Sequence, residues 1–191
     1  MVEAQARPLR ADAERSVRVI LEAAERVLAA DPSASIEQIA VAAGVARTTI
    51  HRRFASRQAL IEALTLSAAQ QLALAVEDGR PATTPPLVAM YRITANVLQV
   101  KGAWTFALEQ STEPNGEAAV LQQSVDRRCV AVLERAQAEG LIDAGADLDW
   151  VRRVYYALIG ESLRDYTGDA DPDLLAGRII DTLLRGAGPR G

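Results

Sequence analysis

Hydrophobic residues recur at spacings of three and four along almost the whole chain, as they do in amphipathic helices. The first clear example is residues 12–30, where one helical face collects Val17, Ile20, Leu21, Ala24, Val27 and Leu28. No segment alternates hydrophobic and polar residues for long enough to indicate a half-buried strand. The pattern predicts an all-α protein.

Segments rich in proline, glycine and small polar residues divide this pattern into about nine helices. After a turn at residues 31–35, Ser35 and Gln38 fit a capping box that starts a short second helix. Gly44 stands where a left-handed residue often ends a helix, and Ser56 where a cap would start the fourth. The remaining helices are expected at about residues 46–55, 57–77, 87–100, 103–111, 117–139, 147–166 and 172–185.

Residues 44–57 differ from the rest of the chain in charge. The segment GVARTTIHRRFASR contains Arg47, Arg52, Arg53 and Arg57 and no acidic residue, although the whole chain has a formal net charge of −4. A basic helix without carboxylates can approach a polyanion closely. A solvated basic face on an ordinary core helix would have the same composition.

The order of residues favours the first interpretation. Two short helices joined at Gly44 describe a helix-turn-helix, and Ile50 and Phe54 would anchor its second helix from behind. The outer face of that helix would then carry the arginines, together with threonines and the chain's single histidine. This is the arrangement with which a helix enters the major groove of DNA.

Residues 15–65 resemble the DNA-binding domain of the TetR (tetracycline-repressor-like) family of bacterial transcriptional regulators. The resemblance rests on AGVARTTIHRRF at residues 43–54, followed by a small residue, a basic residue and a leucine at Ser56, Arg57 and Leu60. His51 replaces the tyrosine that is common in the family, and Ala46 replaces the frequent Ser or Thr cap. The resemblance implies two domains: residues 1–56, an N-terminal arm and the helix-turn-helix, and residues 57–191, a helical bundle for ligand binding and dimerisation.

Three sets of residues are expected to carry the function that the resemblance implies. DNA contacts are expected from Arg47, Thr48, Thr49, His51, Arg52, Arg53 and Arg57. The ligand pocket is expected among Met90, Tyr91, Thr94, Trp104, Phe106, Gln110, Val125, Cys129 and Tyr156. The dimer interface is expected from Val151, Val154, Tyr155, Leu158, Ser162, Leu175, Ile179, Ile180 and Leu183, although the same stripes would also close the core of a monomer.

The resemblance further implies a homodimeric, one-component regulator, which we expect to be a repressor. Its partners would be double-stranded DNA with a palindromic operator and a small apolar or weakly polar effector bound in the C-terminal bundle. We expect no cofactor and no metal ion, since no cluster of metal-ligand residue types stands out in the sequence.

Two alternatives stay open at this point. Cys129 is the single cysteine, which excludes an internal disulfide but leaves a redox-responsive regulator that senses through Cys129. The other alternative is a helical-bundle enzyme or small-molecule-binding protein, although the one histidine lies on the expected DNA face, away from a nucleophile.

The N-terminal residues and the apolar content bear on localisation. The first residues carry acidic side chains and lack the apolar segment of a signal peptide. No unbroken apolar run approaches the roughly 18 residues that span a bilayer. We therefore expect a cytoplasmic protein without a membrane partner.

Overall fold

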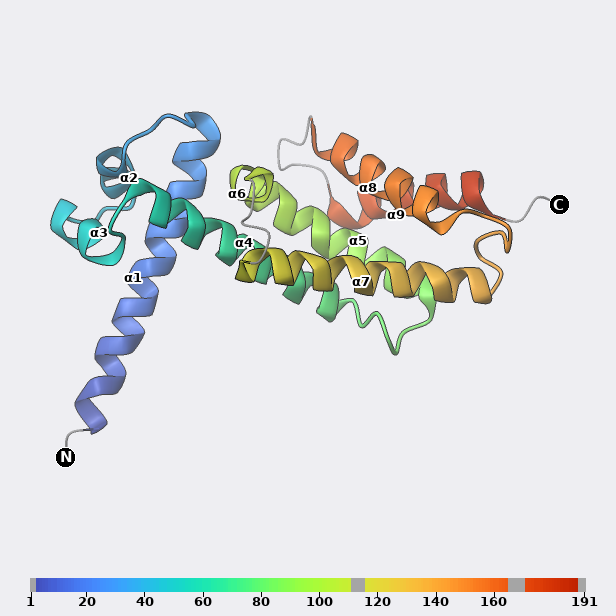
Figure 1. Cartoon of the computed structure of the whole chain (residues 1–191), viewed down its shortest axis with the longest axis horizontal. Coiled ribbons are helices and arrows are strands. Elements are labelled where there is room, and N and C mark those ends of the chain that lie inside the picture. The colour runs from blue at the N-terminus through green and yellow to red at the C-terminus, as the bar shows by residue number, and fades with distance from the viewer. Residues whose placement is uncertain (1–2, 111–115, 165–170, 189–191) are drawn as a thin grey trace. The chain divides into compact units, whose positions relative to one another are not determined.

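The computed structural model describes residues 3–110, 116–164 and 171–188, with side chains from residue 15 onward. Every regular element in these ranges is a helix, as Figure 1 shows, and no strand occurs among them. The helices are α1 (Glu3–Ala30), α2 (Ile36–Ala42), α3 (Arg47–Arg53), α4 (Arg57–Asp78), α5 (Pro86–Ala103), α6 (Thr105–Glu109), α7 (Glu117–Ala138), α8 (Leu148–Arg164) and α9 (Pro172–Ala187). The all-α prediction is confirmed.

Most helix boundaries lie within a few residues of the prediction, and the exception is the start of α1. This helix begins at Glu3, whereas the hydrophobic pattern indicated a start near residue 12. Pro8 and a run of charged and small residues conceal the first turns, because they carry no apolar stripe. The expected helix ends at residues 111 and 166 lie outside the described residues.

The chain packs as two compact units. Unit 1 comprises residues 1–67 and 104–111, and it therefore contains α1, α2, α3, the first half of α4, and α6. Unit 2 comprises residues 68–103 and 112–191, with the second half of α4 and helices α5, α7, α8 and α9. The sequence predicted a boundary at residue 56 between a DNA-binding domain and a ligand-binding domain, and this functional division stays a prediction. The two compact units differ from it, because the boundary between them falls within α4.

Unit 1 is built around the turn that the sequence predicted between two short helices. Ser35 caps α2: its Oγ accepts from the Gln38 N–H at 3.2 Å, and the Gln38 Oε1 accepts from the Ser35 N–H at 2.7 Å. Gly44 has φ +66°, the left-handed conformation that reverses the chain after α2. Ile39 and Ile50, one from each short helix, have no exposed surface. The predicted capping box and helix-turn-helix are confirmed at this level.

Helix α4 begins at a side-chain cap, because the Ser56 Oγ accepts from the Ala59 N–H at 3.1 Å. By length and composition alone α4 would suffice to cross a membrane, with a mean hydropathy of 1.5 over an 18-residue window. Polar residues interrupt the apolar residues of α4, so the sequence contains no unbroken apolar run there. Leu60, Leu64, Ala68 and Val76 of α4 are fully buried, which is the pattern of a core helix in a folded domain.

Unit 2 is a helical bundle in which α5 packs against α7, α8 and α9. Its core includes Leu98, Leu133, Ile159 and Ile180. Among the described residues of unit 2, Thr94 is the one polar residue with no exposed surface. Its Oγ1 lies 2.6 Å from the Met90 carbonyl oxygen and 2.7 Å from the Tyr155 hydroxyl. This hydrogen-bonded pair ties α5 to α8 at the centre of the bundle.

Candidate nucleic-acid interface and ligand cavity

Helix α3 presents the basic face that its sequence predicted. Its anchoring residues are Ile50, with no exposed surface, and Phe54 at the C-terminal end, which is 6% exposed. On the other side Thr49 is half-buried, and the exposed side chains are Arg47, Thr48, His51, Arg52 and Arg53. Ala46, the N-cap residue, supplies no side-chain hydrogen bond, as expected from its identity. A cationic surface free of carboxylates on α3 itself therefore faces solvent.

One carboxylate from the preceding helix lies beside this face. The Oε1 atom of Glu37 is 3.1 Å from the Nη2 of Arg47 and 3.3 Å from the Nε2 of His51. A hydrogen bond to its own backbone N–H, with help from His51 and Arg47, lowers the pKa of the Glu37 carboxyl. Glu37 is thus ionised at neutral pH and is paired with two of the predicted DNA-contact residues, Arg47 and His51. The pairing was not foreseen, although Glu37 and His51 lie on the two helices of one motif.

Arg57 is placed differently from the other predicted contacts. Its Nε donates to the Ala34 carbonyl oxygen at 3.1 Å, and its Nη2 donates to the Pro32 carbonyl oxygen. These bonds connect the start of α4 to the turn between α1 and α2. Arg57 therefore stabilises the helix-turn-helix through its Nε and Nη2 atoms. A contact between Arg57 and a DNA phosphate stays a prediction.

Unit 2 contains a cavity of about 230 Å³ between the second half of α4 and helices α5, α7 and α8. Its apolar walls come from Leu72, Ile93, Val97, Val125 and Ile159. Its polar or polarisable lining comes from Lys101, Gln122, Asp126, Cys129, Tyr155 and Tyr156. Val125, Cys129 and Tyr156 had been predicted as pocket residues. The other lining residues were not predicted. Residues 93, 97 and 101 are four apart on α5 and therefore share a helix face, but this spacing fits core packing equally well.

The remaining predicted pocket residues lie elsewhere. Met90 borders a smaller void with Cys129 and Tyr155, and Thr94 is the buried threonine described above. Tyr91 donates a hydrogen bond of 2.6 Å to Asp181 Oδ1, which joins α5 to α9. None of the three lines the larger cavity.

Trp104, Phe106 and Gln110 belong to unit 1 and not to the wall of this cavity. The physical reason is that α6 packs against α1, where the carboxylate of Glu25 accepts the Phe106 N–H. Aromatic composition had favoured a pocket role for these residues. The contact that places them with α1 joins positions 81 residues apart, so no local pattern reveals it.

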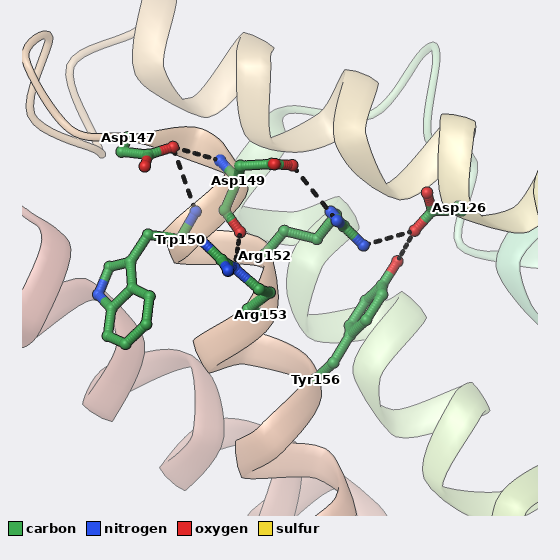
Figure 2. Close-up of polar contacts among 7 residues, drawn as sticks. All are labelled: Asp126, Asp147, Asp149, Trp150, Arg152, Arg153 and Tyr156. Atoms are coloured by element: carbon green, nitrogen blue, oxygen red, sulfur yellow. Dashed lines mark hydrogen bonds and ion pairs between the residues drawn. The ribbon is translucent and has the colours of Figure 1, made fainter.

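Two of the residues that line the cavity, Asp126 and Tyr156, belong to the group of polar contacts drawn in Figure 2. Asp126 Oδ1 accepts a hydrogen bond of 2.8 Å from the Tyr156 hydroxyl and lies 3.2 Å from Arg152 Nη1. The other terminal nitrogen of Arg152 lies 3.3 Å from Asp149 Oδ1, and its guanidinium carbon is 5.6 Å from the centre of the Tyr156 ring. Burial, the nearby Cys129 and Asp126 raise the pKa of Tyr156, so its hydroxyl remains a hydrogen-bond donor. Burial also raises the pKa of the Cys129 thiol to about 11.

The predicted dimer residues divide into two groups. The first group is buried within the single chain and consists of Val151, Tyr155, Ile179, Ile180 and Leu183. The second group is half-buried and consists of Val154, Leu158, Ser162 and Leu175. The first group belongs to the core of unit 2, as the monomer-core alternative had anticipated for these stripes.

The outward face of α8 carries residues that the hydrophobic pattern did not single out. Trp150 is 60% exposed beneath the guanidinium of Arg153, and Ala157 and Gly160 are also exposed. On α9 the exposed apolar residue is Leu174. Within the part of the chain that the structure describes, no three His, Cys, Asp or Glu side chains are grouped so that they could hold a metal ion.

Comparison with known proteins agrees with this architecture. The family model described as bacterial regulatory proteins, tetR family, matches residues 20–64. The HTH-type transcriptional repressor LfrR of Mycolicibacterium smegmatis is 35% identical over 147 residues, which is 76% of each chain. The crystal structure of LfrR from Mycobacterium smegmatis in complex with proflavine superposes with a TM-score of 0.73 at 29% identity, covering 93% of this chain and 98% of that one.

A more distant structure extends the likeness of fold. The TetR family transcriptional regulator PfmR from Thermus thermophilus has a TM-score of 0.75 at 19% identity, over 90% of this chain and 99% of that chain. At this identity the likeness concerns the fold alone.

Proposed function

We propose, because the chain belongs to the TetR family of bacterial transcriptional regulators, that it is a homodimeric repressor released from a palindromic operator by a small effector. DNA binding through the helix-turn-helix is the premise, and the operator, the dimer and the effector are the proposal. The observation that carries it is the exposed cationic face of α3, held from behind by Ile50 and Phe54. Membership of a family of DNA-binding regulators also excludes the alternative that the chain is a helical-bundle enzyme.

The exposed residues of α3 divide by the kind of contact that they are placed to make. Arg47 and Thr48 lie in the first turn of α3, the part of a recognition helix that usually reads base edges. Arg52 lies in the last turn, where a guanidinium suits a phosphate. Thr49, His51 and Arg53 complete the surface and are proposed to contact the sugar-phosphate backbone of the DNA. Operator preference therefore depends on the first turn, and general affinity on the last.

A single helix-turn-helix makes too few contacts for operator-level affinity, which is why such proteins dimerise. The outward face of α8 supports a two-fold interface, because it combines the exposed Trp150 with the small residue Ala157. Half-buried Val154 and Leu158 border it, and Leu174 adds an exposed apolar side chain on α9. The second group of predicted dimer residues, with these exposed neighbours, is the proposed interface.

The cavity of unit 2 is the proposed effector site. At about 230 Å³ it is slightly smaller than typical ligand pockets of about 300–1,000 Å³, so the effector is compact. Apolar walls and two tyrosine rings suit a flat aromatic molecule, and the Asp126 carboxylate suits an amino group on it. LfrR binds proflavine, a flat aromatic amine, which makes that compound the first effector to test.

The redox alternative has less support than ligand control. Cys129 is 6% exposed and its pKa is raised to about 11, so the reactive thiolate is scarce at neutral pH. The operator of a bacterial regulator is cytoplasmic DNA, and we propose the same location for the protein.

The proposal is tested by selecting bound DNA from a random duplex pool with the full-length protein. The expected result is an enriched palindrome whose half-sites are about one helical turn apart, and weaker binding of that DNA when proflavine is added. Failure to enrich any sequence contradicts operator recognition. Enrichment without release by proflavine retains the DNA-binding function and rejects this effector.

A further inference from the structure

Glu25 is the one buried carboxylate among the described residues, with 4% of its surface exposed. Both of its oxygens are used. Oε1 accepts the Phe106 N–H at 2.7 Å, and Oε2 accepts the Ala107 N–H at 3.0 Å. Glu25 lies on α1 and the two N–H groups lie on α6, so this pair of hydrogen bonds joins two helices that are far apart in sequence.

The two bonded N–H groups are those that a helix cannot satisfy by itself. Phe106 and Ala107 are the second and third residues of α6, and the N-cap residue Trp104 offers them no side-chain acceptor. Glu25 therefore caps α6 from another helix, with a charge that complements the helix dipole. A helix of five residues is not stable in isolation, so the position of α6 depends on this cap and on the packing of Ala107.

Opposing effects act on the charge of the buried Glu25 carboxylate. Burial raises the pKa of Glu25, the two backbone N–H groups oppose this effect, and the charge of Glu109 adds to it. Burial of an ionised group costs free energy that hydrogen bonds offset only in part. An apolar residue on α1 would avoid that cost but would leave α6 without an acceptor.

The covalent path of the chain connects this cap to the effector site. Helix α5 lines the cavity with Ile93, Val97 and Lys101, and Trp104 alone separates its last residue from the first residue of α6. The helix that carries Glu25 also contributes Ile20 and Leu28 to the core of unit 1, which supports α3. A shift of α5 would therefore reach α6 through the single residue Trp104, and α6 is hydrogen-bonded to α1.

We propose that Glu25 is the positioning residue that transmits the effector's displacement of α5 and α6 to the DNA-binding unit. The inference rests on the proposed function and adds the residue through which its regulation passes. Glu25 touches neither DNA nor effector. Its two hydrogen bonds make α1 follow α6, and without them α6 moves independently.

The test separates coupling from binding with two variants on α1. Glu25→Gln keeps the size of the side chain but presents an NH₂ group to one of the two N–H donors. Glu22→Gln removes the same charge from an exposed position three residues earlier and serves as the matched control. Thermal unfolding establishes that both variants fold. Operator affinity is then measured with and without proflavine.

We expect proflavine to weaken operator binding at least fivefold in the wild type and in Glu22→Gln, which is the lower end of typical allosteric coupling. In Glu25→Gln the loss is less than twofold, although the affinities for operator alone and for proflavine alone stay within threefold of the wild type. An unchanged response in Glu25→Gln overturns the inference.

A second arm needs no effector. Val97→Trp fills the cavity from α5 and replaces the ligand as the source of displacement. In the presence of Glu25 it is expected to weaken operator binding at least fivefold, and in combination with Glu25→Gln less than twofold. Equal effects in both backgrounds, or no effect in either, overturn the role of Glu25. Absence of operator binding by the wild type itself would instead reject the proposed function.

Discussion

Glu37 of α2 forms an ion pair with Arg47 of α3, with 3.1 Å between Oε1 and Nη2. The pair turns Arg47, which we propose reads bases, toward the protein, so Glu37 and DNA would compete for the same guanidinium. An exposed ion pair contributes only about 0–1 kcal/mol, so DNA can displace Glu37 at little cost.

Glu37→Gln removes this competition and also removes a negative charge next to the phosphates. We expect operator affinity to rise by up to about fivefold, because the exposed pair is worth no more than about 1 kcal/mol. Sequence discrimination at the base pair read by Arg47 should fall. Titration of the selected operator and of a scrambled duplex measures both effects. A tenfold loss of operator affinity in a folded variant would contradict competition and indicate that Glu37 must hold Arg47 in place.

The carboxylate of Asp126 is expected to recognise the amino group of the effector. Asp126→Asn should weaken proflavine binding by roughly 10- to 150-fold, since hydrogen bonds to charged groups contribute about 1.5–3 kcal/mol. Operator affinity without proflavine should be unchanged. Asp149→Asn is the control, because Asp149 also contacts Arg152 but does not line the cavity. Equal proflavine affinities in the two variants would remove Asp126 from the site.

Ala157→Glu tests the proposed dimer face on α8. Ala157 is exposed in the single chain, so the new side chain does not disturb the core, but it would place two carboxylates in a two-fold interface. We expect a monomer by sedimentation and at least a tenfold loss of operator affinity. Ala138→Glu, at an exposed alanine of α7, should remain dimeric. A dimeric Ala157→Glu protein would place the interface elsewhere.

Cys129 should react slowly with thiol reagents in the folded protein. Its pKa of about 11 leaves about 0.1% thiolate at pH 8, compared with roughly a quarter for an unperturbed cysteine of pKa about 8.5. Because the pKa is raised, the reaction should accelerate as pH rises toward 11. We expect a rate at least about 100-fold below that of the denatured chain. Rapid modification at pH 8 that also changes operator affinity would support redox control instead.

Local signals account for the parts of the fold that the sequence predicted. Ser35 and Gln38 satisfy each other within three residues, and Gly44 is required where φ is positive, so both features are visible without tertiary information. The basic face of α3 was predictable for the same reason, since Ile50 and Phe54 define its buried side four residues apart.

The cavity and the interface could not be predicted in the same way. Hydrophobic stripes indicate which side of a helix is covered but not what covers it, so Val151 and Ile179 fit a dimer interface as well as the protomer core in which they lie. The sequence predicted a pocket role for Phe106, but the hydrogen bond from its N–H to the distant Glu25 places α6 against α1. These assignments depend on contacts between residues far apart in sequence.

We propose that Arg52, in the last turn of α3, binds a DNA phosphate, and titration of the operator over a range of salt concentrations measures this contact. Arg52→Ala should weaken binding to all sequences and reduce the magnitude of the slope of log affinity against log salt by about 0.9. Arg127→Ala, which removes an exposed arginine from unit 2, should leave both quantities unchanged. If the Arg52→Ala protein kept the affinity and the salt slope of the wild type, Arg52 would not bind a phosphate and the proposed DNA-binding face of α3 would be wrong.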